Sequence, residues 1–447
     1  MMESIVNPLR LFLLVWGVAT TLYLGGVHAG MFPQPDVRTL AAVLLNAVTF
    51  CLGYLTWTLF QGLGPLPHGP AASSGRRLTP KVMTRALKFT LAVGVVALLL
   101  EMYRLAVVAE HFDTTWVDLA TQPELFRIRL VTFIRENIFR ASGTVMLLSI
   151  TNSLFSIGFV LLGVFFYRDR TRSKYLYLVA FLVISLTIGL IHLSRYETTS
   201  NILCLVLAYC FTCSTDRSGC EVSGRTSPSG VLQISHLKLH ISDYLRLLAP
   251  LAAVVVLFAV IDALLDKSSL YDQPSLLRGF LFQVYWYVAS PLAAFNEFMA
   301  TFTGDHLWGQ STFFPLHKWL YRLHLARETQ VAVYSEMVFI PYAANVYTYL
   351  RNFYEDFGIL GVAIIPYLLG WATAAIRVQA RRHLHWLNLY LVLLLFILFS
   401  FFNHFLISSQ SYLQILFGFA LFRYQFPGDV SNGVSLSEPP AVGSLTA

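Results

Sequence analysis

The chain is poor in charge and in cysteine. Of its 447 residues, 12% are charged and five are cysteines, while 56% are hydrophobic. Globular chains are about 25% charged, so this composition excludes a soluble enzyme and a disordered scaffold. An odd and sparse set of cysteines excludes a disulfide framework. The composition is typical of a polytopic membrane protein.

The chain also lacks the short motifs of soluble enzymes. It contains no GxxxxGK[ST] loop, no GxGxxG turn, no HExxH pair and no GxSxG elbow. Cys210 and Cys213 form a CxxC pair, but zinc sites use a second pair or histidines at set spacing, so we interpret this pair as packing. We therefore expect no metal and no cofactor. The basic residues lie in short loops, and we expect no nucleic-acid partner.

Ten apolar runs approach the length of about 20 residues that a membrane-spanning helix needs. They are residues 11–30, 39–62, 86–108, 143–167, 175–194, 199–213, 247–264, 358–376, 386–406 and 411–424. We therefore predict an all-α polytopic integral membrane protein with about ten transmembrane helices. An alternative prediction makes residues 279–300 a further span.

Basic residues cluster in three loops on one side of these runs. The clusters are Arg76, Arg77, Lys81 and Arg85, then Arg168, Arg170, Arg172 and Lys174, then Arg377, Arg381 and Arg382. Cytoplasmic loops are enriched in Lys and Arg, so the pattern predicts that both termini are cytoplasmic. The first run ends near Ala29 as a signal peptide does, but its length favours an uncleaved first span.

The spans divide the chain into four predicted parts. They are residues 1–265 with the first seven spans, 266–357 as a large outer segment, 358–426 with the last three spans, and 427–447 as a flexible cytoplasmic tail. Residues 276–303 are apolar and aromatic, and Tyr and Trp favour the membrane interface. We expect interfacial helices in the outer segment, and residues 109–142 have the charge pattern of another one.

Two groups of charged residues lie at or near span ends. Arg195 follows the fifth run, where its planar guanidinium suits phosphate oxygens; the alternatives are a pair with Glu197 or extension to the interface. For Arg278, phosphate binding and a structural role are likewise both open. Glu101 and Arg104 are three residues apart on one helix face, which predicts an ion pair, with a substrate contact as the alternative.

Two sequence segments are the most distinctive: GDHLWGQSTFFPL at 304–316 and NVYTYLRNFYEDFGILG at 345–361. The second stretch places Arg351 four residues before Glu355 and five before Asp356, among hydroxyl-bearing side chains. These groups suit a sugar hydroxyl together with a phosphate. The structural alternative is a helix start, where the dipole favours Asp356 and glycines allow close packing.

These two stretches, the arginine after the fifth run and the overall topology resemble the bacterial oligosaccharide repeat-unit polymerases, the Wzy-type O-antigen polymerases. The NVYT and DFGxxG pieces carry most of the resemblance. It implies an enzyme of the bacterial inner membrane that acts on its periplasmic face. The implied reaction is glycosyl transfer of a growing chain from undecaprenyl pyrophosphate onto a new lipid-linked repeat unit, for O-antigen or a related surface polysaccharide.

The resemblance also implies partners and roles. The substrates are undecaprenyl-pyrophosphate-linked oligosaccharides within membrane lipid, and a flippase and a chain-length regulator act in the same pathway. We expect Asp356, Arg351 and Arg195 to be catalytic. We expect the substrate-binding residues to be Arg278, Asn345, Tyr349, Glu355, His306 and His317, with Asp356 first among the candidate bases.

Two other function classes stay open. A ligase that transfers finished polymer from undecaprenyl pyrophosphate needs the same arginines. A flippase or transporter usually places ionisable residues at mid-membrane on broken helices, whereas most of the predicted charge here lies at the outer surface. Deletion separates these classes by what accumulates: single repeat units on core lipid for a polymerase, long polymer on undecaprenyl pyrophosphate for a ligase, and single units on the cytoplasmic side for a flippase.

Overall fold

The computed structural model describes residues 6–63, 80–115, 129, 143–168, 173–191, 195–222, 276–327, 338–344, 346–402 and 408–425. The helices are α2 (Pro8–His28), α3 (Val37–Leu63), α4 (Pro80–His111), α7 (Gly143–Arg168), α8 (Ser173–Ile191), α9 (Arg195–Val222), α11 (Leu276–Thr301), α12 (Phe314–Arg322), α13 (Leu350–Arg382), α14 (Leu384–Phe399) and α15 (Ser409–Gln425). Two short antiparallel strands, β1 (Val338–Phe339) and β2 (Ala343–Ala344), complete the described structure.

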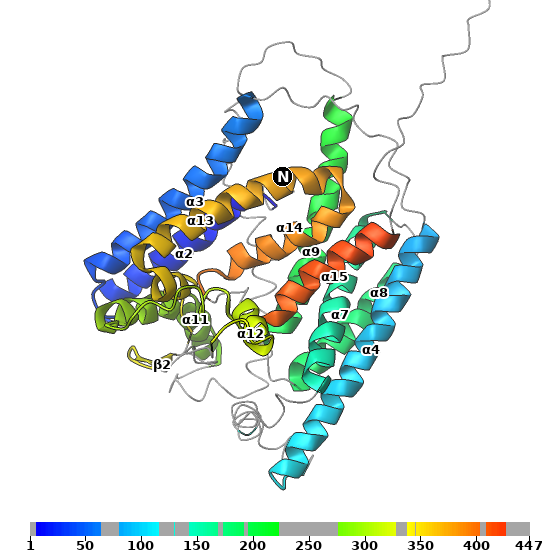
Figure 1. Ribbon diagram of the computed structural model, residues 1–447, viewed down its shortest axis with the longest axis horizontal. Coiled ribbons are helices and arrows are strands. Elements are labelled where there is room, and N and C mark those ends of the chain that lie inside the picture. Colours follow the sequence, from blue (N-terminus) through cyan, green and yellow to red (C-terminus); the bar gives the residue numbers. More distant parts are fainter. Residues whose placement is uncertain are drawn as a thin grey trace, which may run out of the picture.

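The helices form two groups that a central helix joins (Figure 1). One group contains α2, α3, α11 and α13, and the other contains α4, α7, α8, α9 and α15. Helix α14 contacts members of both groups. Every side chain from Tyr390 to Phe399 is buried, as expected for a helix that is apolar on all sides. The core of the bundle therefore lies around α14.

Among the described helices, six are long and apolar enough to cross a membrane: α2, α3, α4, α7, α9 and α13. Helices α8 and α14 carry shorter apolar stretches. The predicted all-helical membrane architecture is confirmed at this level. The sixth predicted run, 199–213, lies within α9, whose candidate spanning part is Glu197–Thr215; the helix itself continues to Val222. The predicted run at 247–264 lies outside the described residues, as do most of 109–142 and the tail at 427–447.

Helix α11 lies across the end of α2 and the segment that follows it. The Tyr285 hydroxyl donates to the Leu22 carbonyl at 3.2 Å. One turn after Pro291, the Asn296 side chain accepts from the Asp36 backbone N–H at 2.7 Å and donates to the Gln34 carbonyl at 3.2 Å. The predicted helix within 276–303 is confirmed. Helices α11 and α12 and the strands lie together at one end of the bundle (Figure 1), called here the α11–α12 end.

Helix α13 folds back on itself at Gly358. This residue has φ 61° and ψ −149°, inside a segment that is otherwise helical. A Cβ on Gly361 would lie 2.3 Å from the Phe353 carbonyl oxygen, although eight residues span about 12 Å in a straight helix. The chain therefore forms a short arm, residues 350–357, packed against a long arm, residues 359–382.

This reversal places Tyr349 deep in the bundle. Its hydroxyl donates to Asn46 Oδ1 at 2.6 Å, nine residues into α3, which is about 13 Å from the helix start. The Tyr349 backbone N–H donates to the Ser400 carbonyl at 2.9 Å, and Trp16 Nε1 donates to Ser400 Oγ at 2.8 Å. We call Tyr349, Asn46, Ser400 and Trp16 the Tyr349 junction. Irregular backbone at such depth is tolerated in membranes where protein buries it or a water-filled cavity adjoins it.

The fold-back predicts that Gly358→Ala lowers stability. A backbone with φ 61° and ψ −149° is essentially restricted to glycine, and strain of this kind costs about 1–3 kcal/mol. The added Cβ would also meet His306 Nε2 at 3.0 Å. The measurement is the thermal unfolding midpoint of the purified protein in detergent.

Gly17→Ala is the matched control for this substitution. Gly17 lies on an exposed face of α2 with nothing within 4 Å of an added Cβ, and alanine favours helix. We expect its midpoint to stay the same or rise. A Gly358→Ala midpoint equal to that of the wild type would contradict the reversal.

Candidate functional site

The segment at 304–313 closes the end of the short arm. The last carbonyls of a helix have no partner within the helix. Here the Leu307 backbone N–H donates to the Glu355 carbonyl at 3.1 Å, and the Trp308 N–H donates to the Asp356 carbonyl at 3.2 Å. The two distinctive sequence stretches therefore fold together, and the residues between them form the connection through α12 and the strands.

The carboxylates of Glu355 and Asp356 hold the turn that leads into α12. Asp356 is fully buried, and its two oxygens accept from the backbone N–H groups of Ser311, at 3.0 Å, and Thr312. The Ser311 hydroxyl donates to Glu355 Oε2 at 2.8 Å, and Asn352 Nδ2 donates to Ser311 Oγ at 2.7 Å. We call Asp356, Glu355, Ser311 and Thr312 the carboxylate clamp.

The clamp predicts that Asp356→Asn loosens the turn before α12. The amide keeps one acceptor oxygen and turns an NH₂ group toward a backbone donor, so one bond to a charged acceptor, worth about 1.5–3 kcal/mol, is lost. We expect hydrogen exchange at residues 307–313 to rise at least tenfold in the purified protein. Asp305→Asn, at an exposed position of the same segment, is expected to leave exchange unchanged, and equal exchange in both variants would refute the clamp.

Arg351 lies on the short arm between two aromatic rings. Its guanidinium carbon is 4.1 Å from the Tyr347 ring centroid and 5.0 Å from that of Phe298 on α11. These distances are within the range of cation–π attraction. One of its terminal nitrogens, Nη1, is buried and has no hydrogen-bond partner among the described residues. The guanidinium is thus held in place by rings and keeps a donor for which the described part of the chain supplies no acceptor.

More aromatic rings continue from Arg351 toward His306. Phe298 lies 6.3 Å from Tyr354, Phe302 lies 5.8 Å from Tyr354, and the His306 ring lies 6.0 Å from Phe302, all between centroids. The imidazole also contacts the Glu355 carbonyl through Nδ1 at 3.3 Å. We call Phe298, Phe302, Tyr347, Tyr354 and His306 the aromatic cradle. It joins one face of α11 to the short arm, and two of its rings, Phe298 and Tyr347, flank the Arg351 guanidinium.

The other predicted site residues lie in different places. Tyr349 is buried in the Tyr349 junction. His317 lies on α12, where no residue in the described ranges hydrogen-bonds its buried Nδ1. Arg278 is exposed in the first turn of α11. Arg195 begins α9, but its side chain is outside the described residues, and so is Asn345. The structure thus groups Arg351, Glu355, Asp356 and His306.

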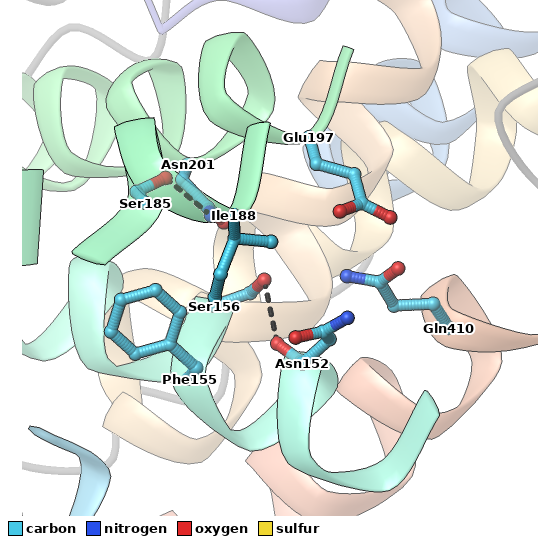
Figure 2. A pocket seen from close by; sticks show the side chains of 8 residues that line it. All are labelled: Asn152, Phe155, Ser156, Ser185, Ile188, Glu197, Asn201 and Gln410. Carbon is cyan, nitrogen blue, oxygen red and sulfur yellow. Dashed lines mark hydrogen bonds between the residues drawn. The ribbon is translucent and has the colours of Figure 1, made fainter. Parts of the chain in front are cut away.

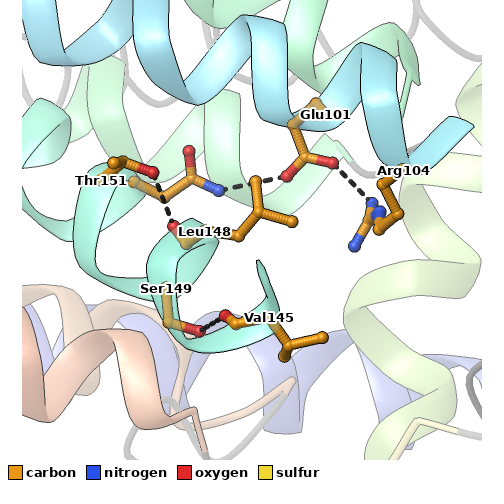
Figure 3. Close-up of polar contacts among 7 residues, drawn as sticks. Glu101, Arg104, Val145, Leu148, Ser149 and Thr151 are labelled. Carbon is orange, nitrogen blue, oxygen red and sulfur yellow. Dashed lines mark hydrogen bonds and ion pairs between the residues drawn. The ribbon is translucent and has the colours of Figure 1, made fainter. Parts of the chain in front are cut away.

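A second polar group lies between α4 and α7. Glu101 is fully buried and pairs with Arg104 at 2.8 Å (Figure 3). Asn152 of α7 donates through Nδ2 to Glu101 Oε1 at 3.3 Å. The predicted ion pair is confirmed. Sequence reasoning missed Asn152, whose signal is an amide within the apolar run at 143–167.

The pair predicts that Glu101→Gln is destabilising. Removing one member of a buried pair leaves the other charge uncompensated and costs about 3 kcal/mol. In the double variant Glu101→Leu/Arg104→Leu we expect most of this loss to disappear, because no unpaired charge is left. Thermal unfolding in detergent measures both, with exposed Glu110→Gln on the same helix as the control. A double variant no more stable than the single one would show that the pair has another role.

Within the described ranges, no three His, Cys, Asp or Glu side chains gather as a metal site requires. Comparison with protein-family models, with curated proteins and with solved structures gives no match. The assignment of function therefore rests on the geometry of the chain itself.

Proposed function

We propose that this protein is a membrane-embedded glycosyltransferase that joins oligosaccharide units linked to undecaprenyl pyrophosphate. The growing chain moves from its lipid pyrophosphate onto a new lipid-linked unit, for O-antigen or a related surface polysaccharide. The observation that carries the proposal is Arg351, a guanidinium held between aromatic rings with a buried donor that pairs with none of the described residues. Phosphate oxygens suit such a donor.

The proposed reaction develops negative charge on the pyrophosphate leaving group, which Arg351 would bind. When the bond between the sugar and the pyrophosphate breaks, the leaving group departs with developing negative charge. Fixed donors aimed at that charge lower the barrier, and removing one typically costs 10²–10³ in rate. In the proposal Arg351 binds the pyrophosphate, and Arg195 and Arg278 assist it. No metal or cofactor is required.

The aromatic cradle supports the sugar side of the same proposal. Aromatic rings offer apolar faces to sugar rings and to prenyl chains, and two rings of the cradle flank Arg351. His306 is exposed and Glu355 is partly exposed beside it, so these two are the candidates to take the acceptor proton. Asp356, whose oxygens both accept backbone N–H groups, acts in this proposal as a positioning residue.

The proposal includes a topology. Ten spans with both termini in the cytoplasm place the basic loops at 76–85, 168–174 and 377–382 on the inside, as the positive-inside rule favours. The α11–α12 end then faces the periplasm of a bacterial inner membrane. Arg351 would approach lipid-linked substrates that have already been moved to the outer leaflet, in a pathway with a flippase and a chain-length regulator.

The test is complementation of a deletion strain with Arg351→Met and Arg351→Lys. We expect the deletion to remove the polysaccharide ladder and leave single repeat units on the core lipid. Arg351→Met should restore less than about 1% of polymer, since a charge-stabilising donor is gone. Lysine keeps the charge without the planar fork and should restore an intermediate amount. Gel analysis of surface glycans and lipid-linked intermediates measures all three.

Arg327→Met, at an exposed position after α12, is the control and should restore the full ladder. Immunoblots of the membrane fraction must show equal protein in every strain. Long polymer retained on undecaprenyl pyrophosphate would identify a ligase instead. Single units trapped on the cytoplasmic side would identify a flippase. A full ladder with Arg351→Met would remove Arg351 from the mechanism.

A further inference from the structure

A small polar pocket lies between α7, α8, α9 and α15 (Figure 2). Inside its open mouth the cavity has room for about one water-sized group, such as a hydroxyl. Its lining consists of Asn152, Phe155, Ser156, Ser185, Ile188, Glu197, Asn201 and Gln410. In Figure 2 the side-chain ends of Asn152, Glu197 and Gln410 face a common space. None of these residues belongs to the cradle or the clamp.

Asn152 gives the clearest sign that the pocket takes a ligand. The side chain is 7% exposed. Its Nδ2 is fixed by the bond to Glu101, and its Oδ1 is buried with no hydrogen-bond partner in the described ranges. Buried polar atoms are nearly always hydrogen-bonded, so this acceptor calls for a donor that the described residues do not supply. The Glu101–Arg104 pair thus fixes the orientation of the amide that lines the pocket.

The pocket lies toward the α11–α12 end. Glu197 is the third residue of α9 and Gln410 is the second residue of α15. Trp319 of α12 lies 6.1 Å from Tyr412 of α15, between ring centroids, so the start of α15 is next to α12. In the proposed topology this pocket lies toward the side on which lipid-linked sugars are presented.

The chemistry of the lining favours hydroxyl groups over ions. Three amides, two hydroxyls and one carboxylate supply acceptors and donors together, whereas a cation site needs acceptors alone. Asn201 Nδ2 already donates to Ser185 Oγ at 3.2 Å, which leaves that hydroxyl able to donate in turn. Phe155 and Ile188 add apolar surface for C–H groups. Sugar hydroxyls match this mixture of donors, acceptors and apolar contact.

We propose that this pocket binds one hydroxyl group of a sugar that lies at its mouth, with Asn152, Glu197 and Gln410 as the contacting residues. The inference rests on the proposed function, in which the sugar is the terminal residue of the acceptor unit. Asn152 Oδ1 accepts from this hydroxyl, and Glu197 and Gln410 bind the neighbouring hydroxyl at the mouth. Glu101 and Arg104 are positioning residues for Asn152.

The test measures binding of a lipid-free repeat unit by the purified full-length protein in nanodiscs. The probe is the oligosaccharide released by mild acid from the host's own surface polysaccharide, and saturation-transfer NMR gives its Kd. We expect Asn152→Leu, Glu197→Gln and Gln410→Ala each to weaken binding about tenfold, since each removes about one hydrogen bond. Ser149→Ala, whose hydroxyl donates to the Val145 carbonyl of its own helix, should bind as the wild type does.

The variants separate this inference from the proposed function. Arg351→Met is expected to bind the free probe normally while making no polymer. If Asn152→Leu elutes as aggregate in size exclusion, the less buried Glu197 and Gln410 variants decide the question. Wild-type affinity in those variants, or stabilisation by NaCl rather than by the oligosaccharide, would overturn the sugar pocket. Clear binding in a protein whose deletion leaves the ladder intact would preserve the pocket and refute the polymerase.

Discussion

The arrangement of this protein depends on the Tyr349 junction. An irregular backbone about 13 Å from the start of α3 needs its polar groups satisfied by protein, because lipid supplies no hydrogen bonds. Tyr349 meets this need twice, through its backbone N–H to Ser400 and its hydroxyl to Asn46. These bonds tie the short arm to α14 and α3, and Trp16 adds α2. The position of Arg351, two residues farther along, follows from them.

The carboxylate clamp and the Glu101–Arg104 pair each use a buried carboxylate to orient an uncharged group. Asp356 fixes two backbone N–H groups before α12, and Glu101 fixes the amide of Asn152. In each case the acid is fully buried and its oxygens are occupied. Acids placed in this way restrict motion at low local dielectric. In the two proposals the contacts with substrate are made instead by neighbouring residues, Arg351 and Asn152, whose side chains each have a donor or an acceptor without a partner among the described residues.

Local properties of the chain were predictable from the sequence, and long-range contacts were not. The runs at 39–62 and 143–167 match Val37–Leu63 and Gly143–Arg168 closely, because hydropathy is a local property. The reversal at Gly358 was missed, although the predicted span began there, since only packing shows that Gly361 contacts Phe353. The pocket was missed because Asn152 and Gln410 are far apart in the sequence and each lies within or beside an apolar run.

Helix α14 has only 16 residues, which is about 24 Å of helix, against a hydrocarbon thickness of about 30 Å. Because its neighbours cover it completely from Tyr390 to Phe399, the length of this helix is not constrained by contact with lipid. Its end at Ser400 is fully buried and is hydrogen-bonded to Trp16 and Tyr349. This helix can therefore end inside the protein, with its polar terminus satisfied by side chains and backbone of its neighbours.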